Sequence, residues 1–224
     1  MFTDNTFRFL DELAANNNRA WFESNKRKYD LLVREPALSF VGKMVPIFEK
    51  IAPSFLADSR KTGGSLMRVY RDTRFSSDKT PYKTNIGIQF RHCLGKDIHA
   101  PGFYVHIASN ECFLAVGCWH PSPDALRNIR NFIVDKPEEW VALFNDKKLT
   151  SQWQLSGESL IRPPRGYAAD HTLINDIKRK DFIALSRLTM DATTGNGLVK
   201  LSGKRFSTAI PYMKFLCAAL HVPY

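Results

Sequence analysis

The sequence predicts an α+β fold, and the spacing of its apolar residues indicates this. Apolar residues recur at helical spacing in the first and last parts of the chain, whereas in the middle they recur at every second position, as in strands. We expect a single domain over 1–224, with a helical section at 1–60, a sheet section at 66–120 and a helical and irregular section at 122–224. The sheet should be mainly antiparallel, with about four or more strands and C-terminal helices on one face.

A helical hairpin is predicted at the N-terminus. Apolar side chains have helical spacing over 7–14, and the run Asn16–Asn18 supplies a helix stop and a new N-cap. A second helix should run over 19–35 until Pro36 interrupts it and opens a third helix. The polar stretch 57–65 contains two glycines and is typical of a loop, so the helical section should end there.

Strands are predicted in the middle of the chain, where the apolar period shortens to two. They cover Leu66–Asp72, Asn85–Cys93, Phe103–Ala108 and Cys112–Trp119, and residues 109–111 should turn the last two into a hairpin.

Alternation within these strands predicts a sheet with two unlike faces. Ile88, Phe90 and Val105 point to one side, on which we expect helices to pack. Tyr104 and His106 point to the other side, which should remain open and polar.

Helices return after the sheet section. Ser122 is a predicted N-cap, and the residues 136–140 should begin a further helix. The segment 162–167 should be irregular, because it contains paired prolines and a glycine. Two more helices are expected near Ile177–Met190 and Arg205–Leu220.

Composition narrows the class of partner. The formal net charge of +10 at pH 7 favours anionic partners such as nucleic acid, phosphorylated metabolites or acidic proteins. Since no apolar run reaches the roughly 20 residues of a membrane helix, we expect a soluble protein with no membrane partner. The four cysteines form no C-x-x-C pair, and the N-terminus lacks the features of a secretion signal. Reduced thiols and a cytoplasmic location are the expectation.

One polar motif stands out, RVYRDTRFSSDKTPYK at residues 68–83, with five basic and two acidic side chains. A strand that leads into such a loop offers guanidinium groups beside hydroxyl and backbone donors, which suits a phosphate or a carboxylate. The predicted ligand-binding residues are Arg68, Arg71, Arg74, Lys79, Tyr82 and Lys83 of the motif, Tyr104 of the sheet, and Arg162 and Arg165 of the proline-containing segment.

Three residues are the candidates for acid and base chemistry. Asp72 and Asp78 lie beside the cations of the motif, and His106 has a side chain whose ordinary pKa is about 6.5. The structural alternative is that the two aspartates only pair with the arginines, so that the loop is a polar staple across the sheet. A single histidine on a sheet face is also more often structural than catalytic.

We predict neither a metal nor a cofactor. No phosphate-binding glycine loop, dinucleotide-binding turn or nucleophile elbow is present in the sequence. The candidate metal-binding side chains lack the paired spacing of zinc ligands; they are His92, Cys93, His99, His106, Cys112, Cys118 and His120.

Five stretches of this chain together resemble the family catalogued as domain of unknown function 2461. They are residues 9–13, 16–22, 68–83, 101–106 and 162–167, so the resemblance spans almost the whole chain. The resemblance implies an intracellular, single-domain α+β protein, mostly found in bacteria. It implies no activity and no catalytic residue.

Three functional hypotheses follow from the residues. The first is a domain that binds a small phosphorylated or otherwise anionic ligand through the 68–83 motif, with enzymatic activity left open. The second is a nucleic-acid-binding module, since arginines alternate with aromatic residues in the motif. The third is a structural or partner-binding protein in which the motif only joins the sheet to the helical hairpin. The sequence leaves the oligomeric state open.

Overall fold

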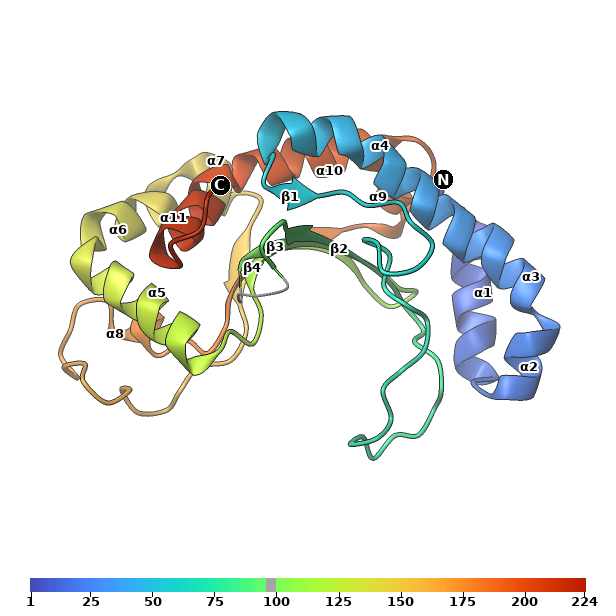
Figure 1. Cartoon of the computed structure of the whole chain (residues 1–224), viewed down its shortest axis with the longest axis horizontal. Coiled ribbons are helices and arrows are strands. Elements are labelled where there is room, and N and C mark those ends of the chain that lie inside the picture. The colour runs from blue at the N-terminus through green and yellow to red at the C-terminus, as the bar shows by residue number, and fades with distance from the viewer. Residues whose placement is uncertain (96–99) are drawn as a thin grey trace.

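The computed structural model describes residues 1–95 and 100–224 (Figure 1). Six strands form one sheet in the order β1-β2-β3-β4-β6-β5, and each neighbouring pair is antiparallel. The strands are β1 (Phe55–Leu56), β2 (Ile86–His92), β3 (Gly102–Ile107), β4 (Cys112–Cys118), β5 (Gln154–Ser156) and β6 (Phe182–Leu188). The predicted α+β class is confirmed, and β2, β3 and β4 match three of the four predicted strands.

The N-terminal helices are α1 (Asp4–Ala15), α2 (Arg19–Ser24), α3 (Lys26–Tyr29), the π-helical turn η1 (Asp30–Arg34) and α4 (Glu35–Ile51). The prediction that Pro36 interrupts the helix is wrong, because helical backbone continues from η1 into α4. Pro36 has no N–H with which to bond the carbonyl of Leu32, four residues earlier. That carbonyl instead accepts a hydrogen bond of 2.9 Å from the Thr6 hydroxyl of α1. The neighbouring helix therefore supplies the donor that proline lacks.

The C-terminal helices are α5 (Pro123–Asp135), α6 (Pro137–Asn145), α7 (Lys147–Thr150), α8 (Ile174–Ile177), α9 (Met190–Thr193), α10 (Gly197–Thr208) and α11 (Ile210–Ala219). The Ser122 hydroxyl accepts the backbone N–H of Ala125 at 3.2 Å, as expected of an N-cap. The helix predicted over 205–220 is two helices, which meet at Ala209. Pro211 lies in the first turn of α11, where its missing N–H costs nothing.

Two further predictions are wrong. Half of the helix predicted over 177–190 is strand β6, which pairs with β4 on one side and β5 on the other. This segment is a strand because it pairs with a strand on each side, and such tertiary context overrides local propensity. The strand predicted over 66–72 is absent and is replaced by isolated bridges, Leu66 to Ile88 and Tyr70 to Tyr82. This segment leaves the sheet after Leu66 and folds back on the residues around Tyr82.

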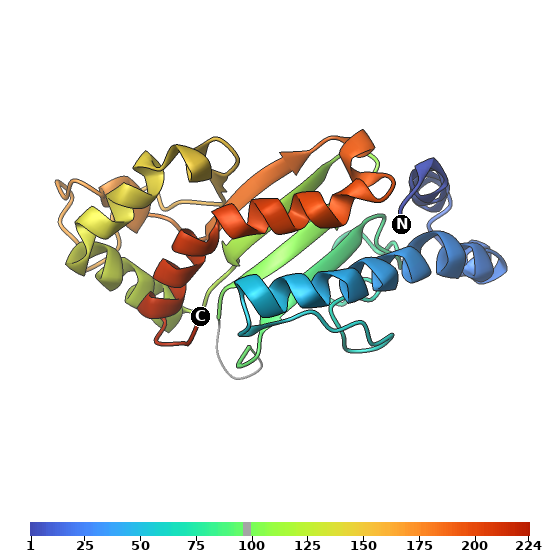
Figure 2. The same ribbon diagram turned by 90° about the horizontal axis from the view of Figure 1, so that it is seen from above.

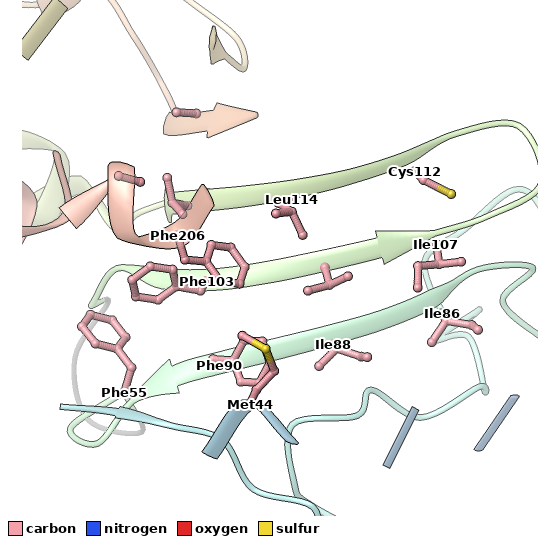
Figure 3. Packing of buried hydrophobic residues seen from close by; sticks show 14 of the residues in the cluster. Met44, Phe55, Ile86, Ile88, Phe90, Phe103, Ile107, Cys112, Leu114 and Phe206 are labelled. Atoms are coloured by element: carbon pink, nitrogen blue, oxygen red, sulfur yellow. The ribbon is translucent and has the colours of Figure 1, made fainter. Parts of the chain in front are cut away.

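Helices α4 and α10 lie over one face of the sheet (Figures 1 and 2). Four phenylalanines form the centre of the contact, and Figure 3 shows three of them from close by, Phe90, Phe103 and Phe206. The rings of Phe48 in α4 and Phe90 in β2 have centroids 4.4 Å apart, and those of Phe103 in β3 and Phe206 in α10 are 5.1 Å apart. Each is almost fully buried. Burial of one such side chain contributes about 2 to 3 kcal/mol, so this layer anchors the sheet to its helices.

The opposite face of the sheet carries no helix of the described residues (Figure 1). Strand register brings its side chains into cross-strand rows, and we call this surface the open face. It comprises Gln89 and Arg91 of β2, Tyr104 and His106 of β3, Phe113 of β4, and Leu185 and Arg187 of β6. The prediction of one helix-covered face and one uncovered face is confirmed.

Residues 66–84, which we call the arm, project on the side of the open face (Figure 1). Helices α5, α6 and α8 lie beyond the other end of the sheet and form the C-terminal lobe with α7 and α11. The chain therefore has the outline of an arch, with α4 and α10 on its outer side. None of the helices in residues 1–95 and 100–224 is long and apolar enough to cross a membrane.

Candidate functional site

The base of the arm is fixed to the N-terminal helices. Asn17 holds the backbone of Tyr82 with two hydrogen bonds, because its amide donates to the Tyr82 carbonyl (2.9 Å) and its oxygen accepts the Tyr82 N–H (3.0 Å). The ring of Tyr82 stacks on Phe22 of α2, with centroids 4.0 Å apart, and is only 3% exposed. Tyr82, a predicted ligand-binding residue, therefore lies in the core, where it secures the arm.

Near the tip of the arm, two of the predicted cations bond to neighbouring residues of the arm. The guanidinium group of Arg74 meets the Asp72 carboxylate with two bonds, Nε to Oδ1 at 3.0 Å and Nη2 to Oδ2 at 2.7 Å. The Lys79 ammonium donates to the carbonyl of Thr73 at 2.9 Å. The tip is consequently a small hydrogen-bonded unit in which these two cations have internal partners.

The Arg71 guanidinium group also bonds to residues of the arm. Its Nη1 donates both to the Asp78 carboxylate and to the Thr80 hydroxyl. Hydrogen bonds from Arg71 and Thr80 lower the pKa of Asp78 to about 2, and those from Arg74 lower the pKa of Asp72 to about 2. Both predicted catalytic carboxylates are therefore ionised near neutral pH, which suits an ion-pair partner better than a general acid.

Phe75 projects from this tip and is 95% exposed. The only described contact of its ring with a cation is with the Arg74 guanidinium, which lies 5.7 Å from the ring centroid. Nothing in the sequence pattern distinguishes this aromatic residue from the others in the motif. The Phe75 ring is therefore in water and accessible from outside the protein.

Arg68 and Lys83 remain at the base of the arm. Neither forms an ion pair with a carboxylate among residues 1–95 and 100–224. Burial, and then the charge of Arg68, lower the pKa of the half-buried Lys83. An anion placed here would be stabilised, because neither cation has a carboxylate within ion-pair distance among the described residues.

His106 and Tyr104 lie side by side on the open face, as alternation predicts. The His106 Nδ1 is 3.3 Å from the Tyr104 hydroxyl and 3.5 Å from the Asn85 amide nitrogen. The imidazole also stacks on Phe113, with centroids 4.6 Å apart and planes only 3° from parallel. The Tyr104 ring is tilted by 50° to the imidazole and by 49° to the Phe113 ring. The three rings form a partly exposed aromatic cluster on the central strands of the sheet, which we call the aromatic platform.

Burial sets the protonation state of this platform. Burial lowers the pKa of His106, although the charge of Glu111 opposes this shift. Burial also raises the pKa of Tyr104, although a hydrogen bond from Asn85 opposes that shift. Both rings are therefore neutral near pH 7. Gly87 leaves room for them, since a β-carbon there would lie 2.7 Å from the Tyr104 hydroxyl oxygen.

The segment 162–167, which contains Arg162 and Arg165, lies at the far end of the sheet from the arm, in the C-terminal lobe (Figure 1). The structure does not bring them together with the cations of residues 68–83. Arg165 lines a surface pocket with Arg127, Arg130 and Tyr167, whereas Arg162 lies outside that lining. The segment is irregular, as predicted.

A histidine and an aspartate that sequence reasoning did not connect meet at the end of β4. Asp181 is 2% exposed, and its carboxylate accepts the backbone N–H groups of His120 (2.8 Å) and Glu158 (3.1 Å). The His120 Nδ1 lies 3.5 Å from the same carboxylate, and His120 has a positive φ of 49°. Because Asp181 satisfies two backbone donors, its first role is to fix this turn. Only the pairing of β4 with β6 brings the two residues together.

No three side chains of His, Cys, Asp or Glu in residues 1–95 and 100–224 are close enough to hold a metal ion. His99, which the sequence analysis weighed as a possible ligand, lies outside the described residues.

Fold and site together define a basic α+β protein in which helices cover one face of an antiparallel sheet and a charged arm borders the other. The chain belongs to the family described as conserved hypothetical protein (DUF2461), whose model matches residues 5–215. The family membership that the sequence motifs predict is therefore confirmed. No curated protein and no solved structure matches the chain.

Proposed function

We propose that this protein binds nucleic acid along the open face of its sheet. The observation that carries the proposal is the aromatic platform of Tyr104, His106 and Phe113, which lies on the uncovered side of the sheet beside the arm. Nucleobases stack on such rings with little dependence on sequence, because each base has a π face.

Cations around the platform supply the second requirement, contacts to phosphate. Arg91 and Arg187 lie on the open face, with exposed side chains, and Arg68 and Lys83 lie at the base of the arm. Arg187 has one acidic neighbour, Glu111, at 3.8 Å, and such exposed pairs are weak enough to exchange for a phosphate. The net charge of +10 adds a long-range attraction for polyanions.

The internal pairing of the arm favours an extended ligand over a small anion held at its tip. Arg71, Arg74 and Lys79 already bond to residues of the arm, so they offer less to a single phosphate than the sequence suggests. In this proposal the paired charges stiffen the arm, and the arm presents Phe75 to a base. His106 acts as a stacking group, and no catalytic step is assigned to Asp72, Asp78 or His106.

A cytoplasmic location belongs to the same proposal. All four cysteines are free thiols, which supports a reducing compartment. No cofactor is needed for the binding mode that we propose.

Salt-dependent binding tests this function. We expect labelled oligonucleotides of about 20 nucleotides and mixed sequence to bind at low salt, and affinity to fall steeply between roughly 20 and 200 mM salt. Fluorescence anisotropy measures both. Replacing Arg91 and Arg187 together by glutamine should weaken binding by about ten-fold and flatten the salt slope by about 1 for each arginine removed.

Lys204→Gln is the matched control, because this exposed lysine belongs to α10 on the other side of the sheet. It should leave affinity nearly unchanged. Absence of binding at the lowest salt, or an equal loss in the control variant, would show that the open face is not a nucleic-acid surface.

A further inference from the structure

Arg130 of α5 is a buried cation, with 9% of its surface exposed. Its Nε donates to the carbonyl of Ile177 at 2.7 Å and its Nη2 to the carbonyl of Arg179 at 2.8 Å. These bonds satisfy two donors but leave the charge uncompensated, since no carboxylate of the described residues pairs with it. A buried cation without a counterion is costly, and an anion bound beside it would remove much of that cost.

Arg130 also lines a surface pocket between α5 and the 162–167 segment, together with Arg127 and Arg165. We call this the basic pocket. Its one described acidic partner is Asp124, 3.3 Å from Arg127, and both side chains of that pair are largely exposed. An exposed pair of this kind contributes little to stability and is easily rearranged. Among the described residues, Arg127 is therefore the one arginine of the three with an ion-pair partner, and that pair is weak.

The remaining walls of the basic pocket are largely apolar. They are formed by Pro121, Pro123, Leu126, Pro164 and Tyr167. The Tyr167 hydroxyl donates to Asn131 of α5 at 2.7 Å, which holds its ring against the helix. Gly166 adopts a positive φ of 93°, and this turn places Arg165 and Tyr167 on the same pocket.

From this arrangement we infer that the basic pocket binds a small phosphate monoester or carboxylate that carries a flat apolar body. The anionic group lies against Arg130 and Arg165, and the apolar part packs on Tyr167 and Pro164. Guanidinium groups suit this task because their planar donor pairs match two oxygens of a phosphate or carboxylate. The inference is independent of the open face, with which the pocket shares no residue.

Phenyl phosphate is a suitable probe, because it combines the two chemical features that the pocket selects. We expect saturable binding by isothermal titration calorimetry, with chemical shift changes at the side-chain Nε–H of Arg130 and Arg165 in NMR spectra. Arg165→Gln should weaken binding by about ten-fold, since it removes a charge-assisted contact from an exposed residue that the fold does not require. Benzyl alcohol, which has the ring but no charge, should not bind.

Arg162→Gln is the matched control, since this residue lies in the same segment but outside the pocket. It should bind phenyl phosphate within about two-fold of the unmodified protein, a change too small for a lost charged contact. The inference is overturned if phenyl phosphate does not bind saturably, or if Arg162→Gln and Arg165→Gln have equal effects. This experiment uses no oligonucleotide, so neither outcome bears on nucleic-acid binding by the open face, which has a separate test.

Discussion

His106 shows how neighbouring groups set the chemistry of a single side chain. Phe113 covers one face of the imidazole, and the Tyr104 hydroxyl and the Asn85 amide approach its Nδ1. Partial burial disfavours the charged form, so the ring is a neutral, flat group at neutral pH. A neutral ring stacks on a base, whereas a protonated ring would favour contact with phosphate.

The lowered pKa of His106 predicts how stability depends on pH. As pH falls through the ordinary histidine value of about 6.5, the unfolded chain takes up a proton that the folded protein resists, so folding loses free energy. His106→Gln removes this contribution. We expect thermal unfolding from pH 8 to pH 5 to show a larger loss of melting temperature for the unmodified protein than for the variant. Parallel losses in the two proteins would mean that His106 is not held neutral by its surroundings.

Phe75 presents the opposite case, a large apolar side chain that folding leaves in water. Its neighbours Asp72, Arg74 and Lys79 are all engaged within the arm. Deleting the Phe75 ring is therefore not expected to affect the core, and any effect would be on a partner.

At the level of elements, the arm depends on a contact between segments that are far apart in the sequence. Asn17, from the turn between α1 and α2, holds the backbone of Tyr82, and Phe22 of α2 holds its ring. Two motifs that identify the family therefore meet at one point. The hypothesis that the 68–83 motif joins the sheet to the helical hairpin describes the base of the arm well, and the tip lies beyond this contact.

Asn17→Ala should destabilise the protein by about 1 to 2 kcal/mol, because it removes both hydrogen bonds to Tyr82. Chemical denaturation measures this loss. Asn16→Ala is the control, since the exposed side chain of Asn16 bonds only within its own helix, to the carbonyl of Glu12 at 2.9 Å. If the two variants lose the same free energy, the Asn17 contact does not hold the arm.

Sequence patterns predicted the elements that rely on local signals. The alternation of β3 and β4 and the Ser122 cap of α5 are examples. Elements that depend on distant partners were not predictable. Strand β6 exists because β4 and β5 pair with it, and the helix passes Pro36 because Thr6 satisfies the carbonyl of Leu32.

In the candidate site, too, the sequence predicts the features that depend on local pattern and misses those that depend on distant partners. Alternation placed Tyr104 and His106 on one uncovered face, and charge density singled out the arm. The sequence could not predict which cations of the arm pair with residues of the arm itself, because this depends on how the loop folds back. Asp181 and the buried Arg130 had no sequence signal, since their partners are at least 23 residues away along the chain.

At the scale of the whole molecule, the helices of the described residues cover one side of the sheet and leave the other side uncovered (Figures 1 and 2). The arm borders the open face at one end, and the C-terminal lobe with its basic pocket borders it at the other. A protein built in this way can hold a long ligand across the sheet and a small anion in the lobe. The two proposals concern different residues and can succeed or fail separately.

Photochemical crosslinking tests the central claim, nucleic-acid binding by the open face, most directly. An oligonucleotide containing 4-thiothymidine is irradiated with the protein at low salt, and the crosslinked peptides are identified by mass spectrometry. The account predicts crosslinks in the peptides that contain β3 and β4, at Tyr104, His106 or Phe113, and at Phe75 of the arm. Crosslinks confined to α4 and α10, on the other side of the sheet, or the absence of any crosslink, would contradict it.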